Sequence, residues 1–295
     1  MTAAPEAAPA PPEATPPPEA MRFAFGANWL RFLDGLDEGA IEAAMRSLQA
    51  MARRNDLAGL NVLDIGAGSG LFSLAARRLG AKVRSFDFDP LSVACAQELK
   101  ARFRPGDGDW IIEQGSVLDA GFMAGLGTFD VVYAWGSLHH TGAMWRALEL
   151  AGERVRKGGV LCVSIYHDQG GTSRRWAEIK RLYHRLPASL RPVLSALVAV
   201  KLWWKTILRD TLRGRPLASW RGYGTERGMS AWRDVVDWVG GWPFEVARPE
   251  AICDFHFARG FTLTGLKTSG GHGCNEFVFV RVPLPASAPG ARASP

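Results

Sequence analysis

The stretch Asn61-Val-Leu-Asp-Ile-Gly-Ala-Gly-Ser-Gly70 joins a mostly apolar strand, Asn61 to Asp64, to a G-x-G-x-G turn. Apolar side chains then recur at helical spacing from Leu71 to Leu79, so the pattern predicts a strand, a glycine turn and a helix. Glycine allows backbone angles closed to other residues and lets a ligand approach the main chain. The start of a helix offers unpaired N–H groups and a partial positive charge. The stretch therefore predicts a site for an acceptor-rich ligand.

Two carboxylates narrow the identity of that ligand. Asp87 ends the apolar run Val83 to Phe86, where an acid at the tip of the second strand can bond the hydroxyls of a ribose. Dinucleotide sites use G-x-G-x-x-G and a bare helix N-terminus for their pyrophosphate. Here Asp64 precedes the first glycine by two residues, where it would repel a pyrophosphate but suit an ammonium and a sulfonium. The glycines alone also fit an ordinary turn of an α/β protein; the two acids favour a cofactor site.

At this point the sequence resembles the class I S-adenosylmethionine (SAM)-dependent methyltransferases. Val62-Leu-Asp-Ile-Gly-Ala-Gly-Ser-Gly70 is similar to their first motif, and Phe86-Asp-Phe-Asp-Pro90 is similar to their second. The resemblance implies SAM as cofactor, with the adenine held by Ser116 and the backbone of Val117 after the third strand. The contacts that it implies come from three motifs and the end of the fourth strand: Asp64, Gly66, Ala67, Gly68, Gly70, Asp87, Phe88, Ser116, Val117 and Trp135.

The rest of the chain alternates strands with helices and closes with a hairpin. Phe129 to Ala134 is a near-continuous apolar run, as a parallel strand covered on both faces requires. Further strands are predicted at 110–113 and 160–165, a turn at 157–159, helices at 40–57, 91–103, 144–155 and 249–260, and a final antiparallel pair at 261–268 and 274–282. We therefore expect an α/β, Rossmann-like seven-stranded methyltransferase sheet, its last strand antiparallel, with a helical insertion after strand 5.

Composition sets the domain plan. The chain has 295 residues, is 47% hydrophobic and 22% charged, and so has globular values. Residues 1–20 and 284–295 are Pro/Ala-rich tails that we expect to be disordered. We expect the SAM-binding domain to comprise residues 21–168 and 249–283. In the N-terminal segment, Phe25, Trp29 and Phe32 share one helical face that either packs on the domain or closes the cofactor site.

Residues 169–248 form a basic, Trp-rich insertion. Between Gly171 and Gly228 there are thirteen Lys and Arg residues and three acidic residues. The local net charge is therefore +10, in a chain whose total net charge is +6. Trp176, Ile179, Leu182, Tyr183 and Leu186 form one helical stripe, and 192–204 is a second apolar run too short to cross a bilayer. Three interpretations compete: a lid over the acceptor, a surface that contacts an anionic membrane through 171–228, and a nucleic-acid site. Ala134-Trp-Gly-Ser137 is not the Asn/Asp-Pro-Pro-Tyr/Phe motif of amino-methylating nucleic-acid enzymes, which argues against the third.

The catalytic candidates follow strands four and five. His139 and His140 lie where the acceptor approaches in the resembled family, and Tyr166 ends the fifth strand at the same edge. Each could instead cap a helix or bond core backbone. A base is needed only where the acceptor must lose a proton. No metal-ligand spacing is visible, and four dispersed cysteines without C-x-x-C indicate a reducing cytoplasm.

We therefore expect a methyltransferase for a small-molecule acceptor, methylated at oxygen. The chain resembles bacterial quinone-type (polyprenyl-hydroxyphenyl) methylases, while its Gly-Gly-Trp-Pro-Phe-Glu245 and Cys274-Asn-Glu-Phe-Val-Phe segments also suggest sugar or glycan acceptors. A membrane-borne acceptor would put a cytoplasmic protein at the inner face of the membrane. The alternatives are a non-catalytic SAM-fold scaffold and an RNA or protein methyltransferase that uses the basic insertion.

Overall fold

The computed structural model describes residues 26, 29, 33–227, 231–269, 271 and 273–282. The two tails, and the N-terminal segment apart from Gly26 and Trp29, lie outside the described residues. The expected pairing of Phe25 and Phe32 with Trp29 on one helical face falls there as well.

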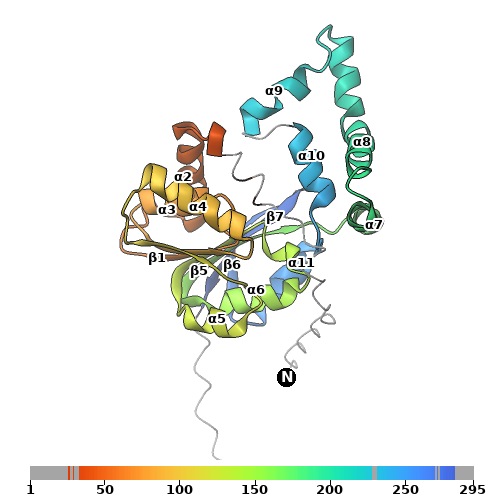
Figure 1. Ribbon diagram of the computed structural model, residues 1–295. Coiled ribbons are helices and arrows are strands. Elements are labelled where there is room, and N and C mark those ends of the chain that lie inside the picture. Colours follow the sequence, from red (N-terminus) through yellow and green to blue (C-terminus); the bar gives the residue numbers. More distant parts are fainter. Residues whose placement is uncertain are drawn as a thin grey trace, which may run out of the picture.

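One seven-stranded sheet forms the centre of the molecule (Figure 1). Its strands follow the order β3-β2-β1-β4-β5-β7-β6. Strands β1 to β5 pair in parallel, while β7 runs antiparallel to both β5 and β6. The predicted fold class is therefore confirmed. The strands are β1 (Asn61–Ile65), β2 (Lys82–Asp87), β3 (Trp110–Gln114), β4 (Phe129–Trp135), β5 (Val155–Tyr166), β6 (Phe261–Lys267) and β7 (Cys274–Arg281).

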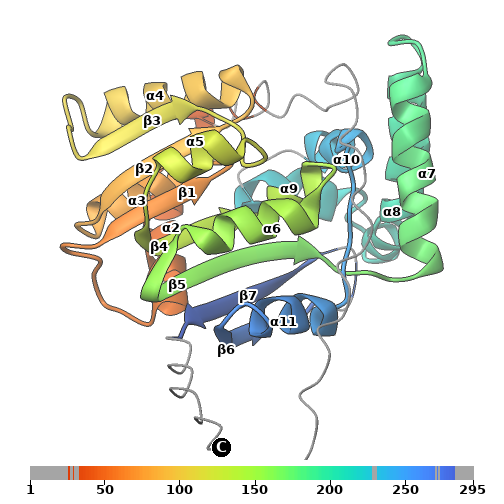
Figure 2. The same ribbon diagram turned by 90° about the horizontal axis from the view of Figure 1, so that it is seen from below.

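Helices cover both faces of this sheet (Figures 1 and 2). Successive strand residues point to opposite faces, so Val62 joins one hydrophobic core and Leu63 the other. The first core packs against α2 (Glu38–Ala52), α3 (Leu71–Arg78) and α4 (Pro90–Phe103), and the second against α5 (Ala120–Gly125), α6 (Met144–Glu153) and α11 (Pro249–Phe257). Burial on both faces explains the continuous apolar run of β4, which the sequence required.

Several predicted boundaries differ from the structure, and two of the differences have a clear local cause. The helix predicted over 40–57 ends at Ala52, because Arg53 adopts a left-handed conformation (φ 52°) and its N–H bonds the carbonyl of Gln49. The turn predicted at 157–159 lies inside β5 as a bulge. There the pairing shifts from Phe129–Val155 to Val131–Val160, and Gly158 has a positive φ of 75°.

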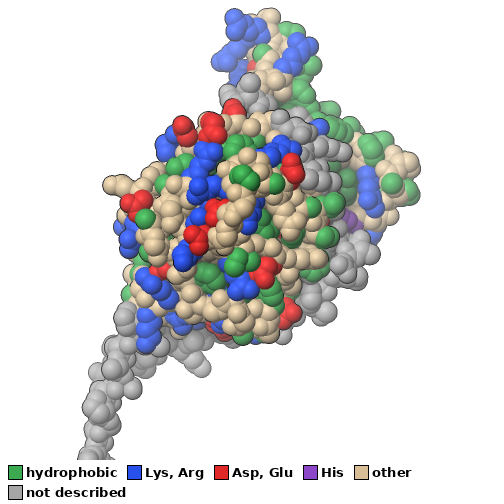
Figure 3. Space-filling model, turned by 60° about the vertical axis from the view of Figure 1, so that its left-hand side comes forward, with side chains coloured by type: hydrophobic (Ala, Val, Ile, Leu, Met, Phe, Trp, Pro, Cys, Tyr) green, Lys and Arg blue, Asp and Glu red, His purple; other side chains and the backbone are tan. Residues whose placement is uncertain are grey.

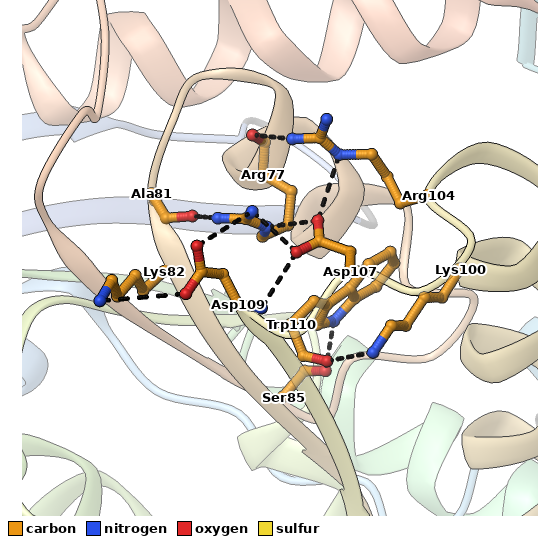
Figure 4. A network of polar contacts seen from close by, with 9 residues as sticks. All are labelled: Arg77, Ala81, Lys82, Ser85, Lys100, Arg104, Asp107, Asp109 and Trp110. Atoms are coloured by element: carbon orange, nitrogen blue, oxygen red, sulfur yellow. Dashed lines mark hydrogen bonds and ion pairs between the residues drawn. The ribbon is translucent and has the colours of Figure 1, made fainter.

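A polar network fixes the outer strands to their helices (Figure 4). Arg77 of α3 donates two hydrogen bonds of 2.9 Å to the carboxylate of Asp107 and also bonds the carbonyl of Ala81. Nearby, the indole N–H of Trp110 donates to the hydroxyl of Ser85 at 3.0 Å. These bonds hold the β2–β3 edge in place, so the loops at its carboxyl end start from a fixed frame.

Four helices between β5 and α11 leave the sheet and return to it (Figure 1), and we call residues 171–240 the helical arm. They are α7 (Gly171–Arg185), α8 (Arg191–Leu212), α9 (Ala218–Arg227) and α10 (Ala231–Gly240). The arm has its own hydrophobic cluster, centred on Trp176, Tyr183 and Val239. Leu182, expected on the same stripe as Trp176, is instead 46% exposed. Within the described residues, no helix is both long enough and apolar enough to cross a membrane.

Candidate active site

A cavity of about 270 Å³ opens at the carboxyl edge of the parallel strands. This is the edge at which open α/β sheets bind their ligands. Its walls come from Trp29 near the start of the chain, from the ends of β1 to β5 and the loops that follow them, and from Trp242, which follows the helical arm. The lining residues are Trp29, Ile65, Gly66, Gly68, Phe86, Asp87, Phe88, Asp89, Ser92, Gly115, Ser116, Val117, Leu118, Trp135, Gly136, Ser137, Leu138, His140, Thr141, Tyr166 and Trp242.

The glycine turn brings the backbone against this cavity. Gly66 and Gly68 have positive φ angles of 70° and 55°. A Cβ on Gly66 would lie 2.4 Å from the Cβ of Ser137, and one on Gly68 would lie 2.9 Å from the indole of Trp29. Both positions therefore need glycine, for conformation and for space.

Asp87 links the turn to the second strand. Its carboxylate accepts hydrogen bonds of 2.9 Å from the N–H groups of Gly68 and Asp89. Burial raises the pKa of Asp87, while these backbone donors oppose that rise. The carboxylate is thus held in one orientation at the cavity wall, where it can accept further bonds from hydroxyl groups.

The charge of the lining matches the cofactor that the sequence implied. Among the described residues that line the cavity, Asp87 and Asp89 carry carboxylates, and none is a lysine or arginine. Such a lining disfavours a pyrophosphate and suits a ligand with an ammonium and a sulfonium. The planar faces of Phe88 and Trp135 offer contacts to a base or to a cation. The residues present therefore fit SAM.

The loop after β3 supplies the third predicted contact. Ser116 and Val117 both line the cavity, and the Ser116 hydroxyl accepts a bond of 3.2 Å from the N–H of Leu118. Trp135, at the end of β4, lies nearly parallel to Tyr133, with ring centroids 5.5 Å apart. These contacts fix the shape of the wall before any ligand enters.

Three predicted cofactor residues do not line the cavity: Asp64, Ala67 and Gly70. Asp64 is buried and accepts a 2.6 Å hydrogen bond from Ser73, and burial raises its pKa to about 7. Ala67 donates its N–H to the carbonyl of Phe86, and a Cβ on Gly70 would lie 2.9 Å from that of Ala96. These residues shape the turn from behind, which a linear motif cannot distinguish from contact.

His140 lies at the other end of the cavity, on the short helix η3 (Leu138–His140). Its Nδ1 is 2.6 Å from the carbonyl oxygen of Pro243. Because a carbonyl only accepts, Nδ1 carries the hydrogen and Nε2 carries the lone pair. Burial, together with the nearby Lys180 ammonium, lowers the pKa of His140 to about 3, so the imidazole is neutral.

His139 does not line the cavity. It is fully buried beneath Tyr166, with ring centroids 4.0 Å apart, and burial keeps its pKa well below the ordinary value. Tyr166 does line the cavity, and burial raises the pKa of its phenol, which therefore stays protonated. The geometry separates the two histidines: His140 faces the ligand space and His139 supports Tyr166.

Trp242 is a lining residue that the sequence did not single out. It follows the arm and lies under the guanidinium of Arg181 of α7, 4.9 Å from its ring centroid. The residues after it are bonded to the carboxyl edge of the sheet, since the N–H of Glu245 donates to the backbone carbonyl of His139 and that of Ala247 to the backbone carbonyl of Tyr166, each at 3.0 Å. The Glu245 carboxylate also accepts from the N–H of Met144. This contact could not be read from sequence, because no local pattern pairs 242–247 with strands four and five.

Comparisons with known proteins agree with this geometry. Residues 36–198, more than half of the chain, match the family described as "Methyltransferase domain", and the chain belongs to that family. It is a SAM-dependent methyltransferase, as its sequence motifs indicated. This class defines the cofactor as SAM and the protein as a transferase.

The relatives differ in their acceptors. The chain is 31% identical over 114 residues to a ubiquinone biosynthesis O-methyltransferase of Azorhizobium caulinodans, covering 37% of this chain and 41% of that protein. It is 40% identical over 76 residues to a ribosomal protein L11 methyltransferase of Bacillus cereus, covering 25% of this chain and 23% of that protein. The matched part thus spans less than half of either relative.

Solved structures share the fold. An O-methyltransferase family protein from Burkholderia thailandensis superimposes with a TM-score of 0.50 at 13% identity, over 82% of this chain and 57% of the other. At that identity the likeness concerns the sheet and its helices alone.

Proposed function

We propose that this protein transfers the methyl group of SAM to a hydroxyl oxygen of a small, hydrophobic acceptor. The observation that carries the proposal is the tautomer of His140. Its Nδ1–H is donated to the carbonyl of Pro243, so the lone pair of the ring is on Nε2, and the ring lines the aromatic end of the cavity. A neutral imidazole can accept a hydrogen bond at the nitrogen that carries its lone pair, as a hydroxyl group of the acceptor requires.

We assign the cofactor to the end of the cavity that holds Asp87 and the glycine turn. Asp87 would bond the ribose hydroxyls, and Ser116 and Val117 would border the adenine. When bound, SAM supplies an electrophilic methyl group whose departure leaves a neutral thioether. The main task of the protein is then alignment, which can supply roughly 7–11 kcal/mol.

His140 would orient the acceptor and receive its proton. A base with a pKa of about 3 is too weak to ionise a free hydroxyl at neutral pH. As the new carbon–oxygen bond forms, however, the oxygen becomes positive and its proton becomes strongly acidic. A weak but permanently neutral imidazole is sufficient at that stage, and Tyr166 can donate a hydrogen bond beside it.

The aromatic end of the cavity favours a planar or lipid-like acceptor. Tyr166 and Trp242 line it, and Phe244 and Trp238 pack behind Tyr166 at 5.3 and 5.5 Å. The similarity to a ubiquinone biosynthesis O-methyltransferase supports a hydroxylated ring. We therefore place hydroxylated aromatics first and sugars, which also stack on tryptophan, second.

We also propose the domain plan given by the sequence. Residues 21–168 and 249–283 would form the SAM-binding domain, and 169–248 would serve as the acceptor lid. Support for the lid comes from Trp242, which follows the arm directly and lines the cavity.

The test compares His140→Ala with His139→Ala on a panel of catechols, hydroquinones and sugars. We expect His140→Ala to lower kcat by ~10²–10⁴-fold while leaving SAM affinity unchanged. Wild-type kcat should show no ionisation of a histidine near pH 6.5, because His140 stays neutral down to about pH 3. If neither substitution lowers kcat tenfold, the assignment of a histidine base is wrong and alignment alone suffices.

A further inference from the structure

The outer face of α8 carries a continuous row of exposed apolar side chains. They recur every three or four residues, so they share one side of the helix. The row, which we call the α8 stripe, consists of Val193, Leu197, Val200, Trp204, Leu208 and Leu212. Leu197 is 64% exposed, Val200 63% and Leu212 80%. Soluble surfaces rarely expose apolar residues in such a contiguous row.

The stripe is not the face by which α8 joins the arm. The opposite side of the helix, with Ser195, Val198 and Ala199, is buried in the arm's own cluster against Trp176 and Val239. The helix is therefore apolar on two sides, and the arm uses only one of them.

Basic residues run parallel to the stripe along one flank. Lys201, Lys205 and Arg209 follow each other at four-residue spacing and are exposed. The Lys205 ammonium lies 5.6 Å from the ring centroid of Trp204, so the two rows adjoin. The one acid on this helix, Asp210, is buried and bonded to Ser219. Figure 3 shows Lys and Arg side chains gathered at the tip of the projecting arm, next to hydrophobic ones.

We propose that the α8 stripe docks the protein on an anionic lipid surface. A helix lying in the interface buries its apolar side among acyl chains while its basic flank meets the phosphate headgroups. The helix has 22 residues, so its axis is about 33 Å long and offers an extended contact. This inference rests on the proposed function, since a protein held at a lipid surface would meet a hydrophobic, membrane-borne acceptor there.

The charge pattern favours lipid over the other partners. In a twofold pairing of α8 with a second copy, the basic rows of two molecules would approach each other and repel. A nucleic acid would use the basic row but would leave the aliphatic side chains without a partner, since bases stack on aromatic rings. An anionic bilayer offers acyl chains to the apolar stripe and phosphate groups to the basic row.

The experiment measures co-sedimentation with vesicles of phosphatidylcholine containing about one third phosphatidylglycerol. The variants are Leu197→Gln with Val200→Gln, which keeps the charge, and Lys205→Glu, which keeps the stripe. Ile111→Gln, at an exposed apolar site on β3, and Lys157→Glu, on β5, are the matched controls. All five positions are exposed, and circular dichroism checks that each variant folds.

We expect wild type to bind the anionic vesicles and not pure phosphatidylcholine. The double glutamine variant should bind at least tenfold more weakly, because each leucine-sized side chain contributes roughly tenfold or more when buried. Lys205→Glu should weaken binding by at least fivefold and reduce its salt dependence, as one basic residue at an anionic surface is worth about a factor of five. Both controls should bind as wild type does.

Four results would overturn the proposal. One is the absence of vesicle binding, and another is binding that the stripe variants leave unchanged. The third is a dimer in sedimentation velocity that Leu197→Gln with Val200→Gln dissolves without lipid, which would assign the stripe to a second copy. Salt-sensitive binding to a random RNA, lost in Lys205→Glu while vesicles are not bound, would overturn it too.

The same preparations keep the two proposals apart. SAM binding and methylation of a water-soluble catechol need only the cavity, so stripe variants should leave both unchanged. Absence of vesicle binding by the wild type, with intact methylation, would sink the lipid surface alone. Vesicle binding without methylation of any acceptor would sink the proposed acceptor chemistry and leave the surface standing.

Discussion

Most apolar side chains of the sheet are buried, whereas along α8 of the helical arm many of them are exposed. In the sheet, Phe277 and Phe279 of β7 are fully buried, and both faces are covered by helices. In the arm, α8 buries one side and exposes another, where Leu197 and Val200 face outward. A residue type therefore does not reveal its role: in the sheet apolar side chains hold the fold together, and along α8 they form a surface.

The sheet and the arm contribute differently to the walls of the cavity. The cofactor end comes from short motifs of the sheet, with Asp87 bonded directly to the glycine turn. The acceptor end combines His140 and Tyr166 of the sheet edge with Trp242, which returns from the arm. The proposed donor site is thus local in sequence, whereas the proposed acceptor site depends on how the arm packs.

The largest expected difference concerns stability. Phe277→Ala should lower the free energy of unfolding by about 3–5 kcal/mol, because it leaves a cavity between packed rings. Leu197→Ala, on α8, should change it by no more than about 0.5 kcal/mol. Urea denaturation followed by circular dichroism measures both. Equal losses would mean that the stripe is packed rather than exposed.

The next effect separates the cofactor end from the rest of the surface. Asp87→Ala should remove charged hydrogen bonds worth about 1.5–3 kcal/mol and lower SAM affinity ~10- to 150-fold. Asp254→Ala, which removes an exposed carboxylate from α11, serves as the control and should bind SAM normally. Calorimetric titration gives both dissociation constants. Unchanged affinity in a folded Asp87→Ala protein would refute the ribose contact.

A third prediction uses pH to probe the burial of the sheet. His256 of α11 lies among Phe255, Phe261 and Phe279, and burial lowers its pKa to about 3. At pH 5 the folded protein keeps it neutral, while the unfolded chain, with an ordinary pKa near 6.5, protonates it. Acid therefore favours unfolding, and stability falls as the pH drops below about 6.5.

His256→Phe should remove this part of the acid sensitivity. Between pH 7.5 and pH 5 the variant should lose about 2 kcal/mol less free energy of unfolding than wild type. Other titrating groups, such as Asp64 with its raised pKa of about 7, are common to both proteins and cancel in the difference. Urea midpoints at the two pH values provide the measurement, and identical pH dependence would show that His256 titrates freely.

The smallest effect tests the link between arm and cavity. Arg181→Ala removes the guanidinium over Trp242, a contact worth about 0.5–1 kcal/mol at an exposed site. The KM for the acceptor should rise two- to fivefold, with kcat and SAM affinity unchanged. Arg185→Ala, on the same helix, is the control. A parallel fall in kcat would show that the arm orders the reacting groups and not only the acceptor pocket.

The cofactor end of the cavity could be predicted from the sequence because the motifs that form it are short and local. The strand, the glycine turn and the helix are adjacent in the sequence. The side-chain periods of 2.0 and 3.6 residues that predict a strand and a helix can be recognised without knowing what either element packs against. The sequence alone could not show which residues of the motif line the cavity, and Asp64, Ala67 and Gly70 do not. It also could not show that His140 lines the cavity while His139 is buried behind it, because that depends on how the turn packs.

The sequence by itself therefore determined the seven-stranded sheet, its antiparallel last strand and the methyltransferase family. Only the tertiary structure decided which histidine faces the ligand, since the partner of His140 is Pro243, 103 residues away in the chain. It likewise decided that Lys180 is buried and that α8 exposes one of its two apolar sides. The physical reason is the same in each case: burial and long-range hydrogen bonds depend on which surfaces meet, and a chain encodes that only through its complete packing.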